Sequence, residues 1–521
     1  MKKIFNFIKN IFNFIKKLFC CGEKKDNITT DKVLEDNKST GNKISNVKPY
    51  NNSTNSTRPT IQNEIIYEEI LYVDKDSDTS SDVSDSDFIK DVETPVEYFD
   101  SINLPVNPDD IKYGEIGGYL MYDKTKVIID ETFVQNVKNM GLNILYINTP
   151  RKKDNPTTFE ECIEIFDKFK GTNIKIMLYI YEAVSMNPRW SDSQIKTISE
   201  HDSFYGWIGE DEVSYKSYNS GNAWIKRYHD MKLSDGSRKW KNIAACYYPK
   251  LSNLNSDMIG ETYYDYLKLW SSSIDVAHAD MYPFVSDRTN NAHLNIESNG
   301  SPIYSIPEGG ENWFDYLKEH CKFTNECPHI THRLYMNSCK HVAKDGVGKL
   351  YIARPKPTEL PIKIQAYANL MSGSNGLMLF VLNDIISNKS GFSESPFNDK
   401  FEKNNDTYNL IKCLFNSDKF INYKNIIVNL NISDVICGCD FKNNNYFIDK
   451  TENENLLIST SNNTTYNYCT VLNTSLDETI SIEVNANQMI VDLDNLKDKK
   501  LNTPEKINLE PGDLILIKSE I

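Results

Sequence analysis

The strongest constraint on the fold is a regular alternation of short apolar segments and longer amphipathic segments in the middle of the chain. Eight apolar segments have the length and flanking residues of strands; they are 117–122, 143–148, 174–181, 204–209, 242–248, 276–283, 333–337 and 376–382. Apolar residues recur at helical spacing between them, in 130–140, 158–169, 191–200, 220–231, 260–270, 312–320 and 362–371. This order predicts an α/β protein with a (β/α)₈ barrel over residues 111–400. A doubly wound open sheet is the alternative, but no glycine-rich phosphate loop follows the first strand.

The last part of the chain has a different pattern. A short helical segment is expected at 407–415, and short strands separated by turn residues follow; they are 426–430, 435–440, 446–449, 456–460, 468–473, 479–484, 489–492 and 513–518. Short strands without long intervening helices are typical of antiparallel structure. Residues 401–521 are therefore predicted to form a small antiparallel β-sandwich.

The first 22 residues contain a near-perfect seven-residue repeat of Ile, Phe, Asn and Lys. On a helical wheel the apolar side chains fill one half and the lysines fill the other, which suits a helix that lies in a membrane interface. Cys20 and Cys21 follow directly and are candidates for S-palmitoylation. We therefore expect residues 1–22 to bind a membrane surface; a coiled-coil or docking helix is the alternative.

Residues 23–110 are polar and rich in Asn, Ser, Thr, Asp and Lys, and they are predicted to be a disordered linker. A membrane-binding helix at 1–22 followed by a disordered linker at 23–110 predicts a peripheral membrane protein, with the barrel on the cytoplasmic face of the membrane. Export into a host or a vacuole is the alternative location.

Composition narrows the classes of partner. The net charge of -15 argues against a nucleic-acid surface, which needs clustered Lys and Arg. The 11 cysteines have no repeated CxxC spacing, so neither a zinc site nor another metal or cofactor is expected. Their scatter, with close pairs at Cys20 and Cys21 and at Cys437 and Cys439, favours buried thiols in a reducing compartment over a disulfide framework.

Chemistry in a (β/α)₈ barrel takes place at the carboxyl ends of the strands. The fourth apolar segment stops at Glu210, Asp211 and Glu212, and the sixth ends with Asp280 and Tyr282. The remaining strand ends supply mostly aromatic and polar residues: Tyr122, Asp123, Asn148, Tyr181, Glu182, Tyr247, Tyr248, Asn337, Asn383 and Asp384. Trp190 and Trp313 are further aromatic residues within reach of this end.

Carboxylates among aromatic residues suit carbohydrate chemistry. Hydrolysis of a glycosidic bond needs a proton donor and a second carboxylate, and aromatic faces pack against sugar rings. His278 shares a strand face with Asp280, but a satisfied core histidine is the commoner interpretation of it and of His332. No Gly-x-Ser-x-Gly elbow is present for serine hydrolysis.

Three segments also resemble a known family. The GWIGEDE segment at 206–212, the DVAHADMYPF segment at 275–284 and the last helix and strand at 365–380 resemble the corresponding parts of glycoside-hydrolase-like TIM barrels related to β-galactosidase and other retaining glycosidases. The following β-sandwich is similar to their common architecture. The resemblance implies that Glu212 is the proton donor and that Asp211 orients it. The chain departs from the pattern at Val213, where a proline often stands, and at the seventh strand, which has no carboxylate for the nucleophile.

The second carboxylate is therefore expected at Asp280, Glu182, or a loop residue such as Glu308 or Glu311. Substrate contacts are expected from Tyr122, Asn148, Tyr181, Glu210, Tyr247, Tyr248, Tyr282, Asn337 and Trp313. The leading hypothesis is a membrane-tethered glycosidase. The alternatives are a catalytically inactive barrel that binds carbohydrate or protein, and a scaffold whose linker carries the interactions.

Overall fold

The computed structural model describes residues 114–122, 129–148, 158–179, 190–213, 226–247, 262–280, 282–283, 313–344, 350–387, 389–441, 447–449, 451 and 453–521. Within these ranges the side chains of 210–213, 263, 344 and 350–353 are not described. The predicted anchor at 1–22 and most of the predicted linker lie outside the described residues. In the described part of the chain, no helix is both long enough and apolar enough to cross a membrane.

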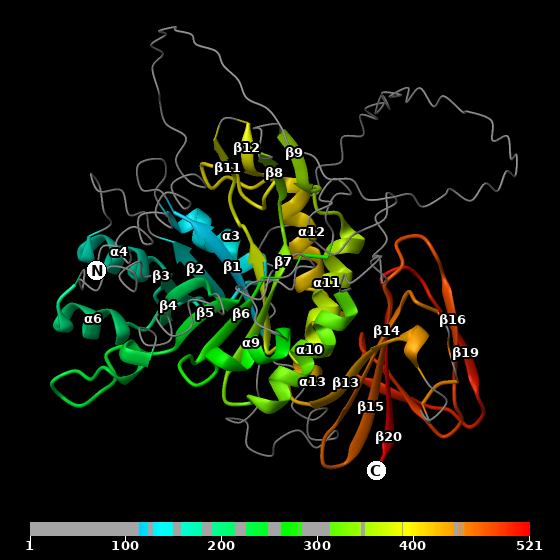
Figure 1. Ribbon diagram of the computed structural model, residues 1–521. Helices are drawn as coiled ribbons and strands as arrows, with labels where there is room; N and C mark the ends of the chain where they lie inside the picture. The colour runs from blue at the N-terminus through cyan, green and yellow to red at the C-terminus, as the bar shows by residue number, and fades with distance from the viewer. Residues whose placement is uncertain are drawn as a thin grey trace, which may run out of the picture. The chain divides into compact units, whose positions relative to one another are not determined.

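Eight parallel strands close into a barrel, as the alternating pattern predicted (Figure 1). Around the barrel their order is β1–β10–β7–β6–β5–β4–β3–β2. Their bounds are β1 Glu115–Met121, β2 Ile144–Asn148, β3 Lys175–Tyr179, β4 Phe204–Val213, β5 Ile243–Tyr247, β6 Val276–Ala279, β7 Thr331–Asn337 and β10 Gly376–Phe380. Helices connect these strands, among them α3 Glu131–Asn139, α4 Phe159–Lys168, α6 Asp192–Ser199, α9 Tyr263–Trp270 and α10 Trp313–Glu326. Another helix, α11 Glu359–Met371, precedes β10.

Local sequence explains where these helices begin. Thr158 and Glu161 form a reciprocal capping box at the start of α4, and Ser191 and Gln194 form another at the start of α6. Asp130 accepts the backbone N–H of Phe133 at 2.8 Å and caps α3. These side chains bond N–H groups that have no partner within the helix. Each helix therefore starts close to its predicted position.

Barrel strands bury both faces, and alternate residues belong to two different cores. Tyr119, Tyr146, His278 and Tyr335 face the barrel interior. The residues between them, such as Leu145, face the surrounding helices. This division follows from the two-residue period of a strand. It decides which predicted site residues can reach the barrel mouth.

Strand β4 is irregular where it carries its acidic residues. Ile208 pairs with Ala244, Glu210 with Ala245 and Val213 with Tyr247, so β4 has two more residues than β5 between the outer pairs. A further register shift lies between the pair Ile176–Phe204 and the pair Met177–Gly206 of β3 and β4. Extra residues of this kind break the alternation of faces along a strand. The two-residue period of a strand therefore does not predict whether the side chains of Glu210, Asp211 and Glu212 face the inside or the outside of the barrel.

Two hairpins that were not predicted form a small sheet beside the barrel mouth. The strands are β8 Lys340–Lys344, β9 Leu350–Arg354, β11 Ile385–Ser387 and β12 Ser390–Ser393, in the antiparallel order β11–β12–β8–β9. In Figure 1 this sheet stands at the top of the barrel. The first hairpin follows β7 and the second follows β10, so both extend from the carboxyl ends of neighbouring strands.

Antiparallel sheets complete the chain, as predicted. A six-stranded sheet has the order β13–β14–β15–β20–β17–β18, and β16 pairs with β19. The bounds are β13 Asn431–Cys437, β14 Leu456–Asn462, β15 Tyr466–Asn473, β16 Ile480–Val484, β17 Met489–Asp492, β18 Lys497–Lys500, β19 Glu505–Leu509 and β20 Leu514–Glu520. Apolar residues of the two sheets, among them Ile458, Ile482 and Ile515, share one core. The pair of sheets is therefore a small sandwich.

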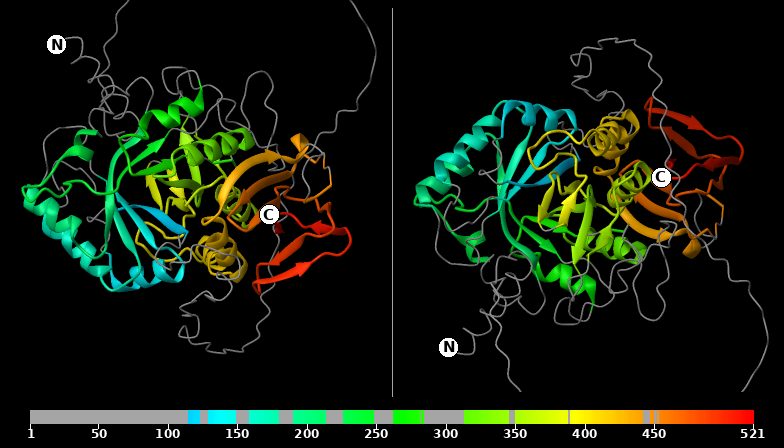
Figure 2. Two further views of the ribbon diagram at one scale, coloured as in Figure 1. Left: turned by 90° about the horizontal axis from the view of Figure 1, so that it is seen from below. Right: turned by 90° about the horizontal axis from the view of Figure 1, so that it is seen from above.

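Two helices lie between the barrel and these sheets (Figure 2). Helix α12 spans Asn405–Phe415, and α13 spans Asp418–Ile427. The predicted strand at 426–430 is wrong, because Ser417 caps α13 and the helix continues to Ile427. The apolar residues there belong to a helix that packs on Tyr367 of α11 through Phe420 and Tyr423. The boundary at 400/401 stays a prediction.

Candidate active site at the barrel mouth

Three side chains from two parts of the fold, the segment after β6 and the end of β9, meet at the carboxyl end of β6. The hydroxyl of Tyr282 donates a hydrogen bond to the Asp280 carboxylate. The guanidinium of Arg354, at the end of β9, lies over the Tyr282 ring with 4.0 Å between Cζ and the ring centroid. Asp280 and Tyr282 were both predicted as site residues, whereas Arg354 was not.

The environment of Asp280 shifts its protonation. Burial raises the pKa of the Asp280 carboxyl to about 6, while the Tyr282 hydroxyl and the Arg354 charge oppose the shift. Burial and the Asp280 charge raise the pKa of Tyr282 far above its usual value, so its proton stays on the phenol. Perturbed carboxyl groups of this kind are commoner at functional sites than elsewhere, although structural networks also produce them.

Aromatic rings line the barrel below and beside Asp280. Phe380 at the end of β10 lies 5.9 Å from Tyr282, 5.8 Å from Tyr335 and 5.3 Å from Phe392, measured between ring centroids. Tyr119 stacks on Tyr146 with centroids 4.4 Å apart. The peptide bond that follows Phe380 is cis. The mouth therefore combines the perturbed carboxyl group of Asp280 with an apolar, aromatic wall.

Two amide side chains also lie on the inner side of the strands. Asn148 Nδ2 donates to the Tyr119 hydroxyl at 2.9 Å, and its Oδ1 is buried without a hydrogen-bond partner. Asn337 at the end of β7 is buried, and its Nδ2 lies 3.5 Å from the carbonyl of Pro355. Its backbone N–H donates to Gln365 Oε1 at 3.0 Å. The amide groups of Asn337 thus serve to join β7 to its surroundings.

Arg354 also retains unused hydrogen-bonding capacity. It is 7% exposed, its Nη2 lies 3.4 Å from His341 Nδ1, and its Nη1 is buried without a hydrogen-bond partner. The rings of Phe380 and Phe392 lie 5.3 and 5.6 Å from its Cζ. Since a buried N–H without a partner costs free energy, this group is suited to bind a ligand oxygen or a water molecule.

Several predicted site residues lie where the structure gives no side-chain description. Glu210, Asp211 and Glu212 belong to β4, but their side chains are outside the described set. Tyr181, Glu182 and Tyr248 are outside the described residues altogether, as are Cys20 and Cys21 and the loop candidates Glu308 and Glu311. Their roles stay predictions.

Three predicted contact residues lie on the outer side of the barrel and do not fit a ligand at its mouth. Tyr247 is fully buried, and its hydroxyl donates to the Leu267 carbonyl of α9 at 3.0 Å. Tyr122 belongs to the outer core, with its ring 6.3 Å from that of Phe401. Trp313 is buried at the start of α10. The strand period explains the two tyrosines, because Tyr247 follows the inward-facing Cys246 and Tyr122 is three residues from the inward-facing Tyr119.

Trp190 and the histidines are also core residues. Trp190 packs 6.1 Å from Trp207 in the outer core. His332 is buried, with Nε2 3.1 Å from the Cys327 carbonyl. His278 lies inside the barrel, with Nε2 3.3 Å from Arg333 Nη1 and Nδ1 3.4 Å from the Tyr335 hydroxyl. Because Arg333 can only donate, Nε2 accepts and the proton of the neutral ring is on Nδ1.

The charge that holds His278 neutral belongs to an internal ion pair. Burial and the neighbouring Arg333 charge lower the pKa of His278 well below its usual value. Arg333 is fully buried, and its Nε donates to Glu115 Oε2 at 2.9 Å.

Among the residues whose positions are described, no group of three or more His, Cys, Asp or Glu side chains is arranged to hold a metal ion.

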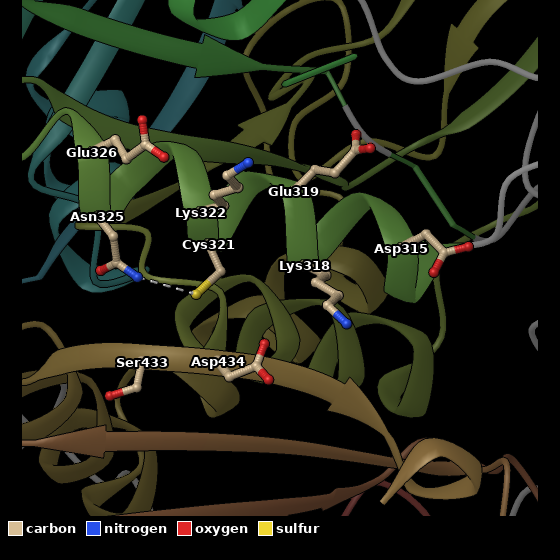
Figure 3. Close-up of a pocket in the computed structure, with 9 residues that line it drawn as sticks. All are labelled: Asp315, Lys318, Glu319, Cys321, Lys322, Asn325, Glu326, Ser433 and Asp434. Atoms are coloured by element: carbon tan, nitrogen blue, oxygen red, sulfur yellow. Dashed lines mark hydrogen bonds between the residues drawn. The ribbon is translucent and has the colours of Figure 1, made fainter. Parts of the chain in front are cut away.

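A separate groove lies outside the barrel. It has a volume of about 650 Å³ and is lined by side chains of α10 together with Ser433 and Asp434 of β13. Figure 3 shows Lys318 and Cys321 pointing from α10 toward β13. Positive and negative side chains alternate along it, as they do on many solvated surfaces. The groove contains none of the residues that meet at the barrel mouth.

Sequence comparison gives no family for this chain: no family model matches it, and no curated protein matches it. Solved structures that match the fold include two β-galactosidases and a mannanase. The β-galactosidase of Bacillus circulans sp. alkalophilus has a TM-score of 0.47 at 7% identity, covering 78% of this chain and 99% of that one. A catalytic mutant of Gan42B, a GH42 β-galactosidase from G. stearothermophilus, has a TM-score of 0.45 at 7% identity, covering 79% and 99%. The endo-β-1,4-mannanase of Thermotoga petrophila has a TM-score of 0.39 at 10% identity, covering 79% and 98%.

The likeness is one of fold alone. The chain has a closed, parallel eight-stranded barrel followed by antiparallel sheets, which is the architecture that the sequence resemblance implied. At these identities and TM-scores, the matches assign no residue, substrate or activity.

Proposed function

We propose that this protein hydrolyses O-glycosidic bonds at the barrel mouth, with Glu212 as the proton donor and Asp280 as the second carboxylate. The observation that carries the proposal is the Asp280 carboxyl, whose pKa of about 6 results from burial among aromatic rings at the end of β6. Carboxylates at strand ends suit the chemistry of sugar hydrolysis, and aromatic walls suit the binding of sugar rings.

The surroundings of Asp280 suit a base or a nucleophile. Above pH 6 its carboxyl is mostly ionised, and the Tyr282 hydroxyl and the Arg354 charge both favour the ionised form. A glycosidase needs one such carboxylate opposite its proton donor. The Arg354 Nη1 and the Asn148 Oδ1 supply a donor and an acceptor without partners, which suits binding of sugar hydroxyl groups.

Glu212 is proposed on the family resemblance and on its strand. Register shifts in β4 coincide with the acidic segment, and bulges of this kind are common beside active sites, where they redirect side chains. Asp211 is proposed to orient Glu212 and to raise its pKa through a like charge. Glu182 is the competing second carboxylate, and variants separate it from Asp280.

The test is hydrolysis of a panel of aryl glycosides by the wild-type protein and by Glu212→Gln, Asp280→Asn and Glu182→Gln. The first two variants are expected to lose roughly 10²–10⁴-fold in rate, the usual contribution of an acid or base. Glu164→Gln, which changes an exposed carboxylate on α4, is the matched control and should retain full activity. Equal rates for Glu212→Gln and the wild type would contradict the proposal, and a loss in Glu182→Gln without one in Asp280→Asn would move the second role to Glu182.

The pH profile gives a second readout. If Asp280 acts as the ionised base, kcat/KM should fall as the pH drops through about 6, because protonation removes the base. Replacement of Tyr282 by Phe removes a hydrogen bond that lowers the Asp280 pKa, so the midpoint should move upward. An unchanged midpoint would assign the titration to another group.

A second function is a barrel that binds carbohydrate or protein without turnover. The observation in its favour is the seventh strand, which ends in Asn337 and whose amide groups contact Pro355 and Gln365. This function predicts glycan-array binding that survives Glu212→Gln, with no hydrolysis by the wild type. Detectable turnover would exclude it.

We also propose that residues 1–22 hold the protein on a membrane surface, at the cytoplasmic face. The support is the amphipathic repeat with lysines on one side and the pair Cys20 and Cys21. A fluorescent protein fused to residues 1–22 should associate with membranes, and Cys20→Ser/Cys21→Ser should weaken the association. A diffuse signal from the intact segment would contradict the proposal.

A further inference from the structure

Most described cysteines are solitary and buried, but two lie side by side at the end of β13. The Sγ atoms of Cys437 and Cys439 are 2.8 Å apart, on either side of Gly438. This separation is shorter than the ordinary contact of two non-bonded sulfurs and longer than the S–S bond of about 2.05 Å. Both residues are free thiols, and only a small movement of either side chain is needed to bring the sulfurs to bonding distance.

The backbone of this turn keeps the two thiols together. Strand β13 ends at Cys437, and Gly438 to Asp440 form a single 3₁₀ turn. A Cβ on Gly438 would lie 2.4 Å from the Asn453 carbonyl oxygen and 2.9 Å from Leu456 Cβ. The tight approach of the 453–456 backbone therefore requires glycine, and the turn that pairs the cysteines is fixed by packing.

The two thiols differ in exposure. Cys437 is buried, with Sγ 3.5 Å from the Glu454 carbonyl, whereas Cys439 is exposed to solvent. Burial, and then the adjacent Cys439 thiol, raise the pKa of Cys437 well above its usual value. An external reagent therefore meets Cys439 first, and Cys437 is protected but within reach of it. An exposed thiol next to a protected one is the arrangement of an attacking and a resolving cysteine.

We propose that Cys437 and Cys439 are a reversible redox pair that reacts with small-molecule disulfides. The Cys439 thiolate attacks one sulfur of a disulfide RS–SR, forming a mixed disulfide and releasing RS⁻, which takes up the proton that Cys439 lost. Cys437 then loses its proton and attacks the Cys439 sulfur, forming the Cys437–Cys439 bond and releasing the second thiol. Two protein thiols are oxidised, and one disulfide is reduced to two thiols.

The sequence offers a direct assay. Tryptic cleavage after Lys424 and Lys442 gives one peptide, 425–442, that contains Cys437 and Cys439 and no other cysteine. Cleavage after Lys412 and Lys419 gives a second peptide, 413–419, whose only cysteine is Cys413. Cys413 is exposed and has no recorded sulfur contact with another described cysteine, so it is a matched control for a single thiol.

The full-length protein is incubated in its folded state with oxidised glutathione, its remaining thiols are blocked, and the peptides are identified by mass spectrometry. Peptide 425–442 should lose two hydrogen atoms and carry no glutathione, while 413–419 should carry glutathione. In Cys437→Ser, Cys439 should retain glutathione, because the resolving thiol is missing. In Cys439→Ser, the buried Cys437 should remain a free thiol.

Two results would overturn the proposal. One is a stable glutathione adduct on peptide 425–442 of the wild type. The other is an unmodified 425–442 peptide when Cys413 is fully modified. Neither result depends on glycosidase activity, so this inference and the proposed function stand or fall separately.

Discussion

The ion pair inside the barrel allows a quantitative test of the structure. Arg333 is fully buried, while the Glu115 side chain is 24% exposed. Its carboxylate accepts from both Nε and Nη2 of Arg333, and it also faces Lys424 of α13, whose pKa burial lowers to about 8. Glu115→Gln therefore removes the negative charge that serves two partly or fully desolvated cations.

The expected cost follows from the burial of the partners. Removal of one member of a buried pair typically costs about 3–5 kcal/mol, because the other charge stays desolvated. The partial exposure of Glu115 lets water replace some of the lost interaction, so we expect about 3 kcal/mol, at the low end of that range. This loss reduces the ratio of folded to unfolded protein by roughly 100-fold.

Tryptophan fluorescence during urea unfolding is a suitable measurement. All six tryptophans precede residue 314, so the signal reports the barrel part of the chain. The matched control is Glu326→Gln, which breaks the exposed pair of Lys268 and Glu326 and should lower the stability much less than Glu115→Gln does. The double variant Glu115→Gln/Arg333→Met should recover part of the loss, since it removes the unpaired charge. A Glu115→Gln midpoint equal to that of Glu326→Gln would refute the reasoning.

Three other predictions concern the barrel strands. Gly206→Ala should destabilise the protein by about 2 kcal/mol or more, because the new Cβ would lie 2.4 Å from the Asn242 carbonyl oxygen. Gly209→Ala in the same strand is the control and should cost little stability, because its Cβ would lie 3.6 Å from the nearest atom. Equal unfolding midpoints for the two variants would contradict this prediction. Tyr247→Phe should cost about 1 kcal/mol of stability and leave any activity unchanged, because the Tyr247 hydroxyl donates to a helix carbonyl away from the barrel mouth. A loss of activity without a loss of stability would show that Tyr247 contributes to the site. The raised pKa of Asp280 means that the folded state binds its proton more tightly than the unfolded state, so its contribution to stability falls as the pH rises from about 4 to about 6; the melting-temperature difference between Asp280→Asn and the wild type should shift in favour of the variant over that range, and no shift would argue against the raised pKa.

Much of the barrel could be predicted, because its strands and helices have regular periods. The predicted strand at 143–148 and the observed β2, Ile144–Asn148, differ by one residue, and the helix at 158–169 begins at the Thr158 cap that the sequence carries. Local patterning and long-range packing agree in these elements. The two-residue period of a strand likewise assigns Asp280 to the same face as His278, and the structure shows that His278 faces the barrel interior.

The other features of the site depend on long-range contacts, which the spacing of apolar residues along the sequence does not predict. Arg354 and Phe392 come from hairpins with few alternating apolar residues, and only the fold brings them to Tyr282 and Phe380. Tyr247 was expected at the barrel mouth because it ends a strand, but its side chain lies on the outer face of that strand. The acidic segment of β4 has two residues more than β5, so even a correct strand assignment leaves its side-chain directions open.

The core that surrounds the barrel has a consequence for how this protein can be divided. It continues from the barrel helices through Tyr367 and Tyr423 into Leu472 and Leu516 of the six-stranded sheet. Asn422 donates to the Leu493 carbonyl at 2.8 Å, and Asn325 donates to the Ile432 carbonyl at 2.6 Å across the same junction. A barrel expressed without the sheets would expose this apolar surface to water and be prone to aggregation. The two halves are therefore expected to be inherited, expressed and unfolded as one piece.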